Sequence, residues 1–412
     1  MKRIIIAALL LISGMSVRAG DKVRPVPDSV RAEVADIPLA TRRLIAFEPY
    51  YYAVRHGRRN DARGVGNAWY DRFRIMHISD VHRSADLLSE AISLASGRCD
   101  VIANTGDDGW ASSNSTGQYT LGLLDNVEGI LSQGTGGVPY VGVNGNHDVP
   151  NTTKAEYFRK MSSKISSLAD VHWGDPANFR TYGYVDVSNK RETIRMIMLD
   201  MFDYPDGEYS TKRKFMTCTF SQAQVDWLIA TLKDAVAKGY KVITMGHYSF
   251  GDNDLPFGEE KAKPDADFYQ DWWMIPDIID AMQHKTTLSH TYKDKAQGGT
   301  QDITVNEDFS GLGDLHYICH LFGHIHSKNY YRCQKTDGSK MYDILMLGEH
   351  SLAAKGTALN KTYHDAGTIN EISLSILEID TSEHCIYRVS YGAYMNYDNS
   401  PSSVITKIPY RF

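Results

Sequence analysis

The chain has few cysteines for its length. Five occur among 412 residues, and no two of them form a CxxC pair. Zinc knuckles and small disulfide-built domains need paired or closely spaced cysteines, so neither can organise this fold. Two of the five lie in apolar segments, where a buried and inert thiol is the usual role. An exported chain could still form a disulfide among Cys99, Cys218, Cys319, Cys333 and Cys385.

Long apolar runs are missing except at the N-terminus. Residues 1–20, MKRIIIAALLLISGMSVRAG, begin with Lys2 and Arg3, continue with an apolar run and end in small residues up to Ala19. This order is typical of a signal peptide that is cleaved near Ala19. A membrane anchor is the alternative, but the run is shorter than the roughly 20 residues that a spanning helix needs. We expect residues 1–19 to be a signal peptide, and the mature chain to be exported to the periplasm or the extracellular space without a transmembrane span.

The sequence also lacks an excess of positive charge. Its net charge is -6 at pH 7, and removal of the predicted leader, which carries three basic residues and no acidic one, makes it more negative. This charge disfavours indiscriminate binding to nucleic acid, so we expect no specific nucleic-acid partner. A hydrophobic content of 42% and a charged content of 23% are typical of a folded globular protein.

The order of the predicted elements indicates an α/β fold. Residues 20–70 are read as an irregular N-terminal extension. Strand-like and amphipathic helical segments then alternate, which predicts βαβ units and a partly parallel sheet. The segments are the strands 74–79, 99–104 and 138–143 and the helices 85–95 and 119–132.

The second half of the chain is predicted to add more strand than helix. Residues 222–240 form an amphipathic pattern that ends at Gly239, as expected of a helix. The predicted strands are 182–187, 193–199, 241–246, 316–322, 342–348, 371–380 and 385–391. Residues 251–313 break the pattern and are read as an insertion, in which the pair Trp272 and Trp273 forms a core or, alternatively, a lid. No linker divides the chain, so residues 71–412 are predicted to form one domain with C-terminal strands.

Side chains that can bind metal follow five of the predicted strands. Ligand sites of open α/β sheets lie outside the carboxyl ends of strands, so this placement is informative. Nitrogen and oxygen donors without thiolate suit Mn, Fe, Zn or similar divalent ions. The set is too large for one open site, whereas two metals that share a bridging carboxylate can use it. Its members are Asp80, His82, Asp107, Asn146, His147, Asp148, His247, His324 and His326.

The segment GHIH at 323–326 raises a question of geometry. If its backbone is extended, His324 and His326 point to the same side and can serve one site. Glycines precede Asp107, Asn146, His247 and His324, and they are expected to allow tight turns near the ions.

The ordered motifs resemble the signature of the calcineurin-like metallophosphoesterases. They are D-x-H at 80–82, GD at 106–107, GNHD at 145–148, GH at 246–247 and GHxH at 323–326. GD or GH alone occurs by chance, but the complete ordered set at strand ends is specific. The resemblance spans about 74–326 and implies a fold of two mixed β-sheets packed as a sandwich and flanked by helices.

The resemblance also implies a role for each motif residue. One metal would be bound by Asp80, His82 and His326, and the second by Asn146, His247 and His324. Asp107 would bridge the two ions, and an extended His-x-His would offer one imidazole to each.

The implied reaction is hydrolysis of phosphate mono- or diesters by attack of a metal-bound hydroxide. His147 would stand beside the substrate, free of the metals, and donate to the leaving oxygen. Asp148 would orient that imidazole, or alternatively serve as a turn residue. Purple acid phosphatases carry a tyrosine ligand after GD, which GDDGW lacks, so an iron-tyrosinate centre is not expected. Asp108 could tune the site or be a solvated neighbour, and the solvated neighbour is the favoured reading.

Three residues beside the motifs are candidate substrate contacts: Arg83, Trp110 and Tyr248. The expected partner is a small-molecule, lipid or nucleotide phosphate ester. Arg83 is the one clear cation beside a motif, which favours diesters because monoesterases often add cationic clamps. A non-catalytic phosphate-binding module on the same fold is the alternative function, and it would be expected to have lost ligands or the catalytic histidine. A closed structural metal site conflicts with the number of donors.

Overall fold

The computed structural model describes residues 72–110, 117–149, 153–203, 218–250, 273–294, 301–335, 339–352, 371–392 and 405–411. The predicted signal peptide, the N-terminal extension and Trp272 lie outside these residues. None of the described helices is long and apolar enough to cross a membrane.

One sheet has six strands in the order β15-β14-β13-β1-β2-β3. The alternating first part of the chain supplies three neighbouring parallel strands, β1 (Phe73–Ile78), β2 (Val101–Asn104) and β3 (Tyr140–Gly142). The end of the chain supplies three antiparallel strands, β13 (Ser373–Asp380), β14 (Cys385–Gly392) and β15 (Ile405–Pro409). Strand β13 pairs with β1, so the two parts meet in the middle of the sheet.

The second sheet has seven strands in the order β11-β12-β10-β7-β6-β5-β4. Its parallel centre consists of β6 (Thr193–Met198), β7 (Lys241–Met245), β10 (His316–Phe322) and β12 (Met341–Gly348). Antiparallel strands complete both edges, namely β4 (His172–Trp173), β5 (Gly183–Ser188) and β11 (Tyr330–Gln334). The predicted addition of strands in the second half of the chain is confirmed.

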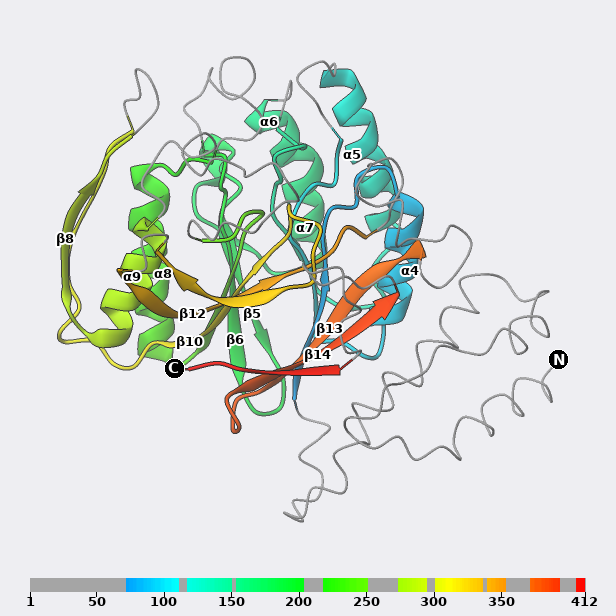
Figure 1. Cartoon of the computed structure of the whole chain (residues 1–412). Coiled ribbons are helices and arrows are strands. Elements are labelled where there is room, and N and C mark those ends of the chain that lie inside the picture. Colours follow the sequence, from blue (N-terminus) through cyan, green and yellow to red (C-terminus); the bar gives the residue numbers. More distant parts are fainter. Residues whose placement is uncertain are drawn as a thin grey trace, which may run out of the picture.

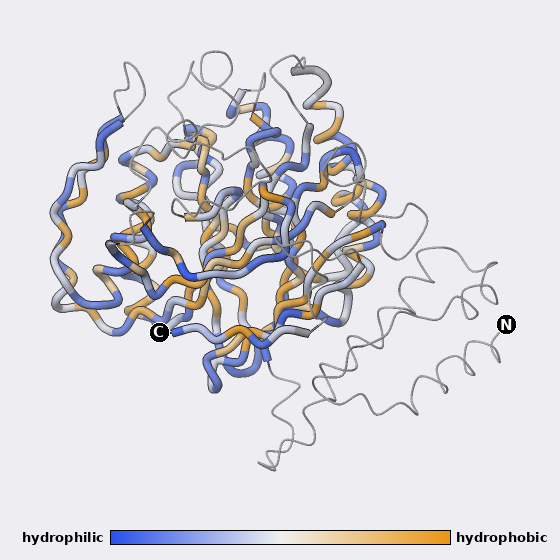
Figure 2. The backbone as a smooth tube through the Cα atoms, viewed as in Figure 1, coloured by the Kyte–Doolittle hydropathy of each residue, from blue (hydrophilic) through white to orange (hydrophobic). Residues whose placement is uncertain are grey.

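The two sheets pack face to face around one apolar layer. Ile75 and Val101 of the first sheet belong to the same buried cluster as Ile243 and Leu321 of the second. Figure 2 shows the apolar stretches concentrated along these central strands. The predicted sandwich of two mixed sheets is therefore confirmed.

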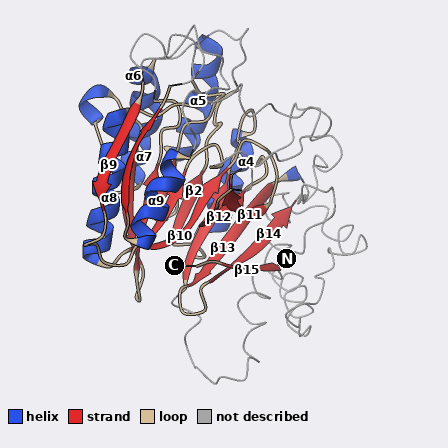
Figure 3. Ribbon diagram, turned by 60° about the vertical axis from the view of Figure 1, so that its left-hand side comes forward, coloured by secondary structure: helices blue, strands red, loops and turns tan. Residues whose placement is uncertain are grey.

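Helices cover the outer face of each sheet (Figures 1 and 3). The helices α4 (Ala85–Ala95) and α5 (Gly117–Leu131) pack with the first sheet, and α8 (Gln222–Lys238) packs with the second. Helix α8 begins after Ser221, whose Oγ accepts a hydrogen bond from the Gln224 amide at 3.2 Å. It ends at Gly239, which has the left-handed φ of 65° that ends many helices.

Short helical segments join β3 to the second sheet. They are α6 (Lys154–Tyr157), the π-helical turn η2 (Phe158–Ser162), α7 (Ser163–Leu168) and the 3₁₀ turn η3 (Pro176–Asn178). The sequence analysis contained no helix in this region.

Part of the predicted insertion is regular. It contains α9 (Met274–His284) and the hairpin of β8 (Thr287–Tyr292) and β9 (Ile303–Asp308) at the outer edge of the molecule (Figure 1). The ring of Trp273 stacks on Tyr342 of β12 at a centroid distance of 5.8 Å. This contact supports the core role predicted for Trp273. The domain boundaries remain a prediction.

Candidate metal centre

The loops that follow five strands meet at one place. Strands β1, β2 and β3 lead to Asp80, His82, Asp107 and Asn146, and β7 and β10 lead to His247, His324 and His326. Both sheets thus contribute their carboxyl ends to one site, and the structure brings all seven predicted ligands into it.

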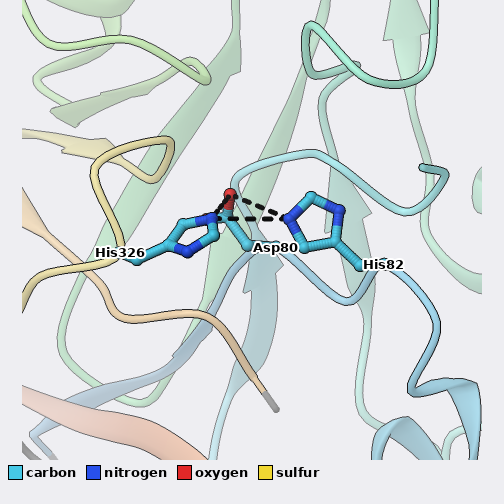
Figure 4. Close-up of side chains that lie close together, drawn as sticks. All are labelled: Asp80, His82 and His326. Carbon is cyan, nitrogen blue, oxygen red and sulfur yellow. Dashed lines mark hydrogen bonds and ion pairs between the residues drawn. The ribbon is translucent and has the colours of Figure 1, made fainter. Parts of the chain in front are cut away.

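A first group of donors surrounds Oδ1 of Asp80 (Figure 4). His326 Nε2 lies 3.0 Å from this oxygen and His82 Nε2 lies 3.7 Å from it. The two imidazole nitrogens are 3.4 Å apart. One nitrogen from each imidazole and one carboxylate oxygen therefore converge on a single small volume.

A second group surrounds the amide oxygen of Asn146. His247 Nε2 lies 2.9 Å from Asn146 Oδ1, and His324 Nδ1 lies 3.0 Å from it. Asp107 Oδ2 connects the groups, because it lies 3.2 Å from His247 Nε2 and 3.9 Å from His82 Nε2. This is the place that a carboxylate needs in order to bridge two ions.

The backbone at the donors is left-handed. The described part of the chain contains eight non-glycine residues with positive φ, and five of them are predicted ligands: Asp80, His82, Asp107, His324 and His326. The expectation of an extended His-x-His is therefore wrong, because β10 ends at Phe322 and both histidines have φ near 50–65°. Such backbone is costly for non-glycine residues, and its concentration here is typical of a functional site.

Two of the motif glycines are needed for space. A Cβ atom on Gly106, which has a φ of 97°, would lie 2.9 Å from the Gly145 nitrogen and 2.9 Å from His247 Nδ1. A Cβ atom on Gly145 would overlap the carboxylate of Asp107. The loops after β2 and β3 can approach each other this closely only because both positions are glycine.

Backbone carbonyls orient two of the imidazoles. His82 Nδ1 lies 2.9 Å from the Gly109 oxygen, and His247 Nδ1 lies 2.7 Å from the Thr105 oxygen. A proton on each Nδ1 leaves the Nε2 lone pair facing the centre, which is the arrangement of a metal-binding histidine. These contacts could not be predicted from the sequence, because any residue has a carbonyl group.

The carboxylate of Asp80 indicates that the donors fit metal ions. Its Oδ2 accepts hydrogen bonds from Ser79 Oγ at 2.5 Å and from the His324 amide at 3.1 Å. Its Oδ1 is buried, and although His326 Nε2 lies 3.0 Å away, no described residue forms a hydrogen bond of good geometry with it. A buried carboxylate oxygen without such a bond is costly, and a cation bound among the three groups would satisfy it.

The charges of the centre form two balanced pairs. Burial lowers the pKa of His247, but the Asp107 carboxylate, together with Asp80 and the Thr105 carbonyl, raises it overall to about 9. Burial likewise opposes the effect of Asp80 on His326, whose pKa is raised overall. Each carboxylate thus favours a proton on the imidazole beside it, and a bound cation would replace that proton.

The other two imidazoles are neutral. Burial lowers the pKa of His82 to about 4, although Asp107 and Asp80 oppose it. Burial and the nearby His247 lower the pKa of His324 to about 3. Neutral imidazole is the form that binds metal, so these two ligands need no deprotonation.

Asp148 joins the loop after β2 to the loop after β3 through hydrogen bonds. Its carboxylate accepts backbone N–H groups of Asp107 at 3.0 Å, Asp108 at 3.3 Å, Gly109 at 2.5 Å and Gly145 at 2.7 Å. The structure therefore gives Asp148 a direct role in holding the bridging Asp107, which the sequence did not indicate.

Asp108 is not the solvated neighbour that was expected. It is 2% exposed, and its Oδ1 accepts a hydrogen bond from Asn104 Nδ2 at 2.7 Å. Burial, together with the charge of Asp107, raises its pKa to about 7. A single sequence position after GD carries no sign of this burial.

The predicted catalytic and substrate residues occupy different depths. His147 is half-buried, and its backbone N–H donates to Asp107 Oδ1 at 2.8 Å. Arg83 is exposed and Trp110 is half-buried beside the centre. Tyr248 is only 5% exposed, and its ring lies 4.1 Å from that of His324. Tyr248 therefore packs against the predicted metal ligand His324, and its contact with substrate stays a prediction.

Residues that follow β12 also reach the site, although the sequence did not indicate them. Ser351 Oγ donates to the Asp80 carbonyl at 2.9 Å, and the ring of His350 lies 6.4 Å from that of His326. The Leu352 amide donates to the Ser79 carbonyl at 2.9 Å. These residues carry no motif, and only the pairing of distant strands brings them here.

A family model for calcineurin-like phosphoesterases matches residues 73–328. The chain belongs to the calcineurin-like phosphoesterase family. This result agrees with the resemblance of the ordered motifs, and it indicates a phosphoric ester hydrolase that depends on metal.

Two solved structures are similar to this chain, and the first of them agrees with the fold. A dimetal phosphatase from Danio rerio is 13% identical with a TM-score of 0.50, and the alignment covers 83% of this chain and 100% of that one. The protein TT1561 of Thermus thermophilus is 12% identical with a TM-score of 0.36, over 74% of this chain and 93% of that one. A search of curated proteins found no match.

Proposed function

We propose that this protein is an exported phosphoesterase that uses two divalent metal ions to hydrolyse phosphate esters. The observation that carries the proposal is the place of Asp107 Oδ2 between the two donor groups, 3.2 Å from His247 Nε2 and 3.9 Å from His82 Nε2. The leader-like residues 1–19 support export. Mn, Fe and Zn all suit the nitrogen and oxygen donors.

In this proposal, the residues of the site bind the two metal ions in separate groups. One ion would be held by Asp80, His82 and His326. The other would be held by Asn146, His247 and His324. Asp107 would bind both ions. When bound, the ions activate a water molecule and stabilise charge on the phosphoryl oxygens. No serine or cysteine nucleophile is then required.

His147 serves as the proton donor in this proposal. Its backbone bond to Asp107 fixes it beside the donor groups, and its ring centroid lies 5.4 Å from that of His82. A half-buried imidazole at this place can reach the leaving oxygen of a bound ester. Arg83 is exposed next to His82 and can pair with the remaining negative charge of the substrate.

Diesters are the proposed preferred class. A monoester carries an additional negative charge, which phosphatases often meet with several cationic side chains. Here Arg83 is the basic residue that directly follows a ligand. A strong preference for a monoester would overturn this part of the proposal.

The test is metal content and hydrolysis by the mature chain. Wild-type protein and Asp107→Ala are purified identically and assayed with bis-p-nitrophenyl phosphate and p-nitrophenyl phosphate. About two ions per chain, with metal-dependent hydrolysis that the variant loses, are expected. Bound metal without hydrolysis of either ester would favour a phosphate-binding module instead.

A further inference from the structure

The indole of Trp110 contacts three side chains of the site. It stacks on His147 with a centroid distance of 4.9 Å and an interplanar angle of 6°. It meets His82 edge-on at 4.6 Å and 78°. The guanidinium carbon of Arg83 lies 5.1 Å from its centroid.

The position of Trp110 is fixed by the residue before it. The Gly109 amide donates to Asp148 Oδ1 at 2.5 Å, and the Gly109 carbonyl lies 2.9 Å from His82 Nδ1. Gly109 thus forms hydrogen bonds both with Asp148, which joins the two loops, and with the predicted metal ligand His82. Trp110 directly follows Gly109, so its backbone is held in place while its ring stacks on His147.

The ring of His147 is packed against its neighbours. Its main-chain N–H donates to Asp107, and rotation of the imidazole about its side-chain torsions is opposed by the edge-on contact with His82 and by the stack on Trp110. A parallel stack on a large aromatic face restricts this rotation, because tilting the imidazole breaks the contact. The stack therefore fixes the plane of the imidazole ring, in which the nitrogen that would face the leaving group lies.

We propose that Trp110 is a positioning residue that orients His147 for proton donation. This inference rests on the proposed function. In the reaction, the oxygen of water forms a bond to phosphorus and the bond to the leaving oxygen breaks. The leaving oxygen takes the electron pair and the proton of His147, and the attacking water releases a proton that restores the histidine.

The proposal differs from the role that the sequence suggested for Trp110. A substrate contact would change binding, whereas a positioning residue changes the proton-transfer step. The face of the indole that stacks on His147 is already covered, so a substrate could use that face only by displacing the imidazole.

The experiment measures how kcat depends on the leaving group. Aryl phosphate diesters with leaving groups from p-nitrophenol to phenol are compared for wild type, Trp110→Ala, Trp110→Phe and His147→Gln. Phenol needs a proton more than p-nitrophenol does. We expect Trp110→Ala to lower kcat about tenfold or more for phenol and much less for p-nitrophenol, in the pattern of His147→Gln. Trp110→Phe, which keeps an aromatic face, should restore most of the loss.

Trp273→Ala is the matched control, because this tryptophan stacks on Tyr342 of β12. Its leaving-group dependence should equal that of wild type. Metal content and thermal midpoint are measured for every variant, and a Trp110→Ala chain that does not fold is replaced by Trp110→Leu.

Two results would overturn the proposal while wild type is active. One is an equal loss of kcat for all leaving groups, and the other is a rise of KM with kcat unchanged, which would make Trp110 a substrate contact. A wild-type chain that hydrolyses none of the esters would refute the proposed function itself, and the inference with it.

Discussion

His247 Nε2 lies 3.2 Å from Asp107 Oδ2, and both side chains are almost completely buried. Their ion pair occupies the place between the two donor groups. Its histidine proton and a metal ion compete for the same lone pair, so the chemistry of this pair controls how the centre is loaded.

Metal binding should depend on pH. The pKa of His247 is about 9 in the metal-free protein, so the imidazole is protonated at pH 7 and must lose a proton to bind. Below pH 9 the affinity of the second group should fall about tenfold for each unit of pH. Titration against a competing chelator from pH 6 to pH 9 measures this slope. An affinity that is constant over that range would contradict the assignment of His247 as a ligand.

Asp107→Asn should remove metal and activity together. The amide keeps the shape of the side chain but supplies one neutral oxygen in place of a carboxylate that serves both groups. We expect less than one ion per chain by elemental analysis and no hydrolysis above background. Full occupancy in this variant would show that Asp107 is not the bridge.

His147→Gln should keep the metals and lose turnover. His147 stands beside the donor groups, so its removal changes no predicted ligand. General acid catalysis contributes roughly 10²–10⁴-fold, and kcat should fall within that range for a substrate with a poor leaving group. Elemental analysis of the same preparation checks that the ions remain, and an unchanged kcat would reject the role of His147.

Asp148→Asn should destabilise the fold and weaken metal binding. The amide keeps one oxygen and replaces the other with an NH2 group, so at least one of the backbone N–H groups that now donate to the carboxylate loses its acceptor. Leaving buried donors unpaired costs about 1–3 kcal/mol for each group. A lower midpoint in thermal unfolding is expected, while the exposed Asp170→Asn should leave it unchanged. Equal midpoints for the two variants would show that Asp148 does not fasten the loops.

The sequence predicted which residues form the site but not how the backbone presents them. Strand patterns and ordered motifs were sufficient to bring Asp80 and His324 together, because carboxyl ends of strands converge in this class of fold. The left-handed φ of these residues accompanies a close approach of their two loops, where a Cβ atom on Gly323 would lie 1.8 Å from Ser79 Oγ. A local pattern contains no record of such contacts.

Burial of Asp108 and the arrival of Ser351 at the site have the same origin. Asn104 at the end of β2 donates hydrogen bonds to Asp108 and to Tyr140 of β3, and Ser351 reaches Asp80 because β12 lies beside β10. Both depend on strand order, which periodicity alone does not determine.

The pairing of β1 with β13 has a consequence for how the protein is made. Met76 lies opposite Ile376, 300 residues later in the sequence, so β1 gains this neighbouring strand only after β13 has been synthesised. Contacts between residues so distant in the sequence slow folding. The predicted metal ligands Asp80 and His82 directly follow β1. The centre should therefore form late, and a nascent chain that ends before β13 should not retain its ions.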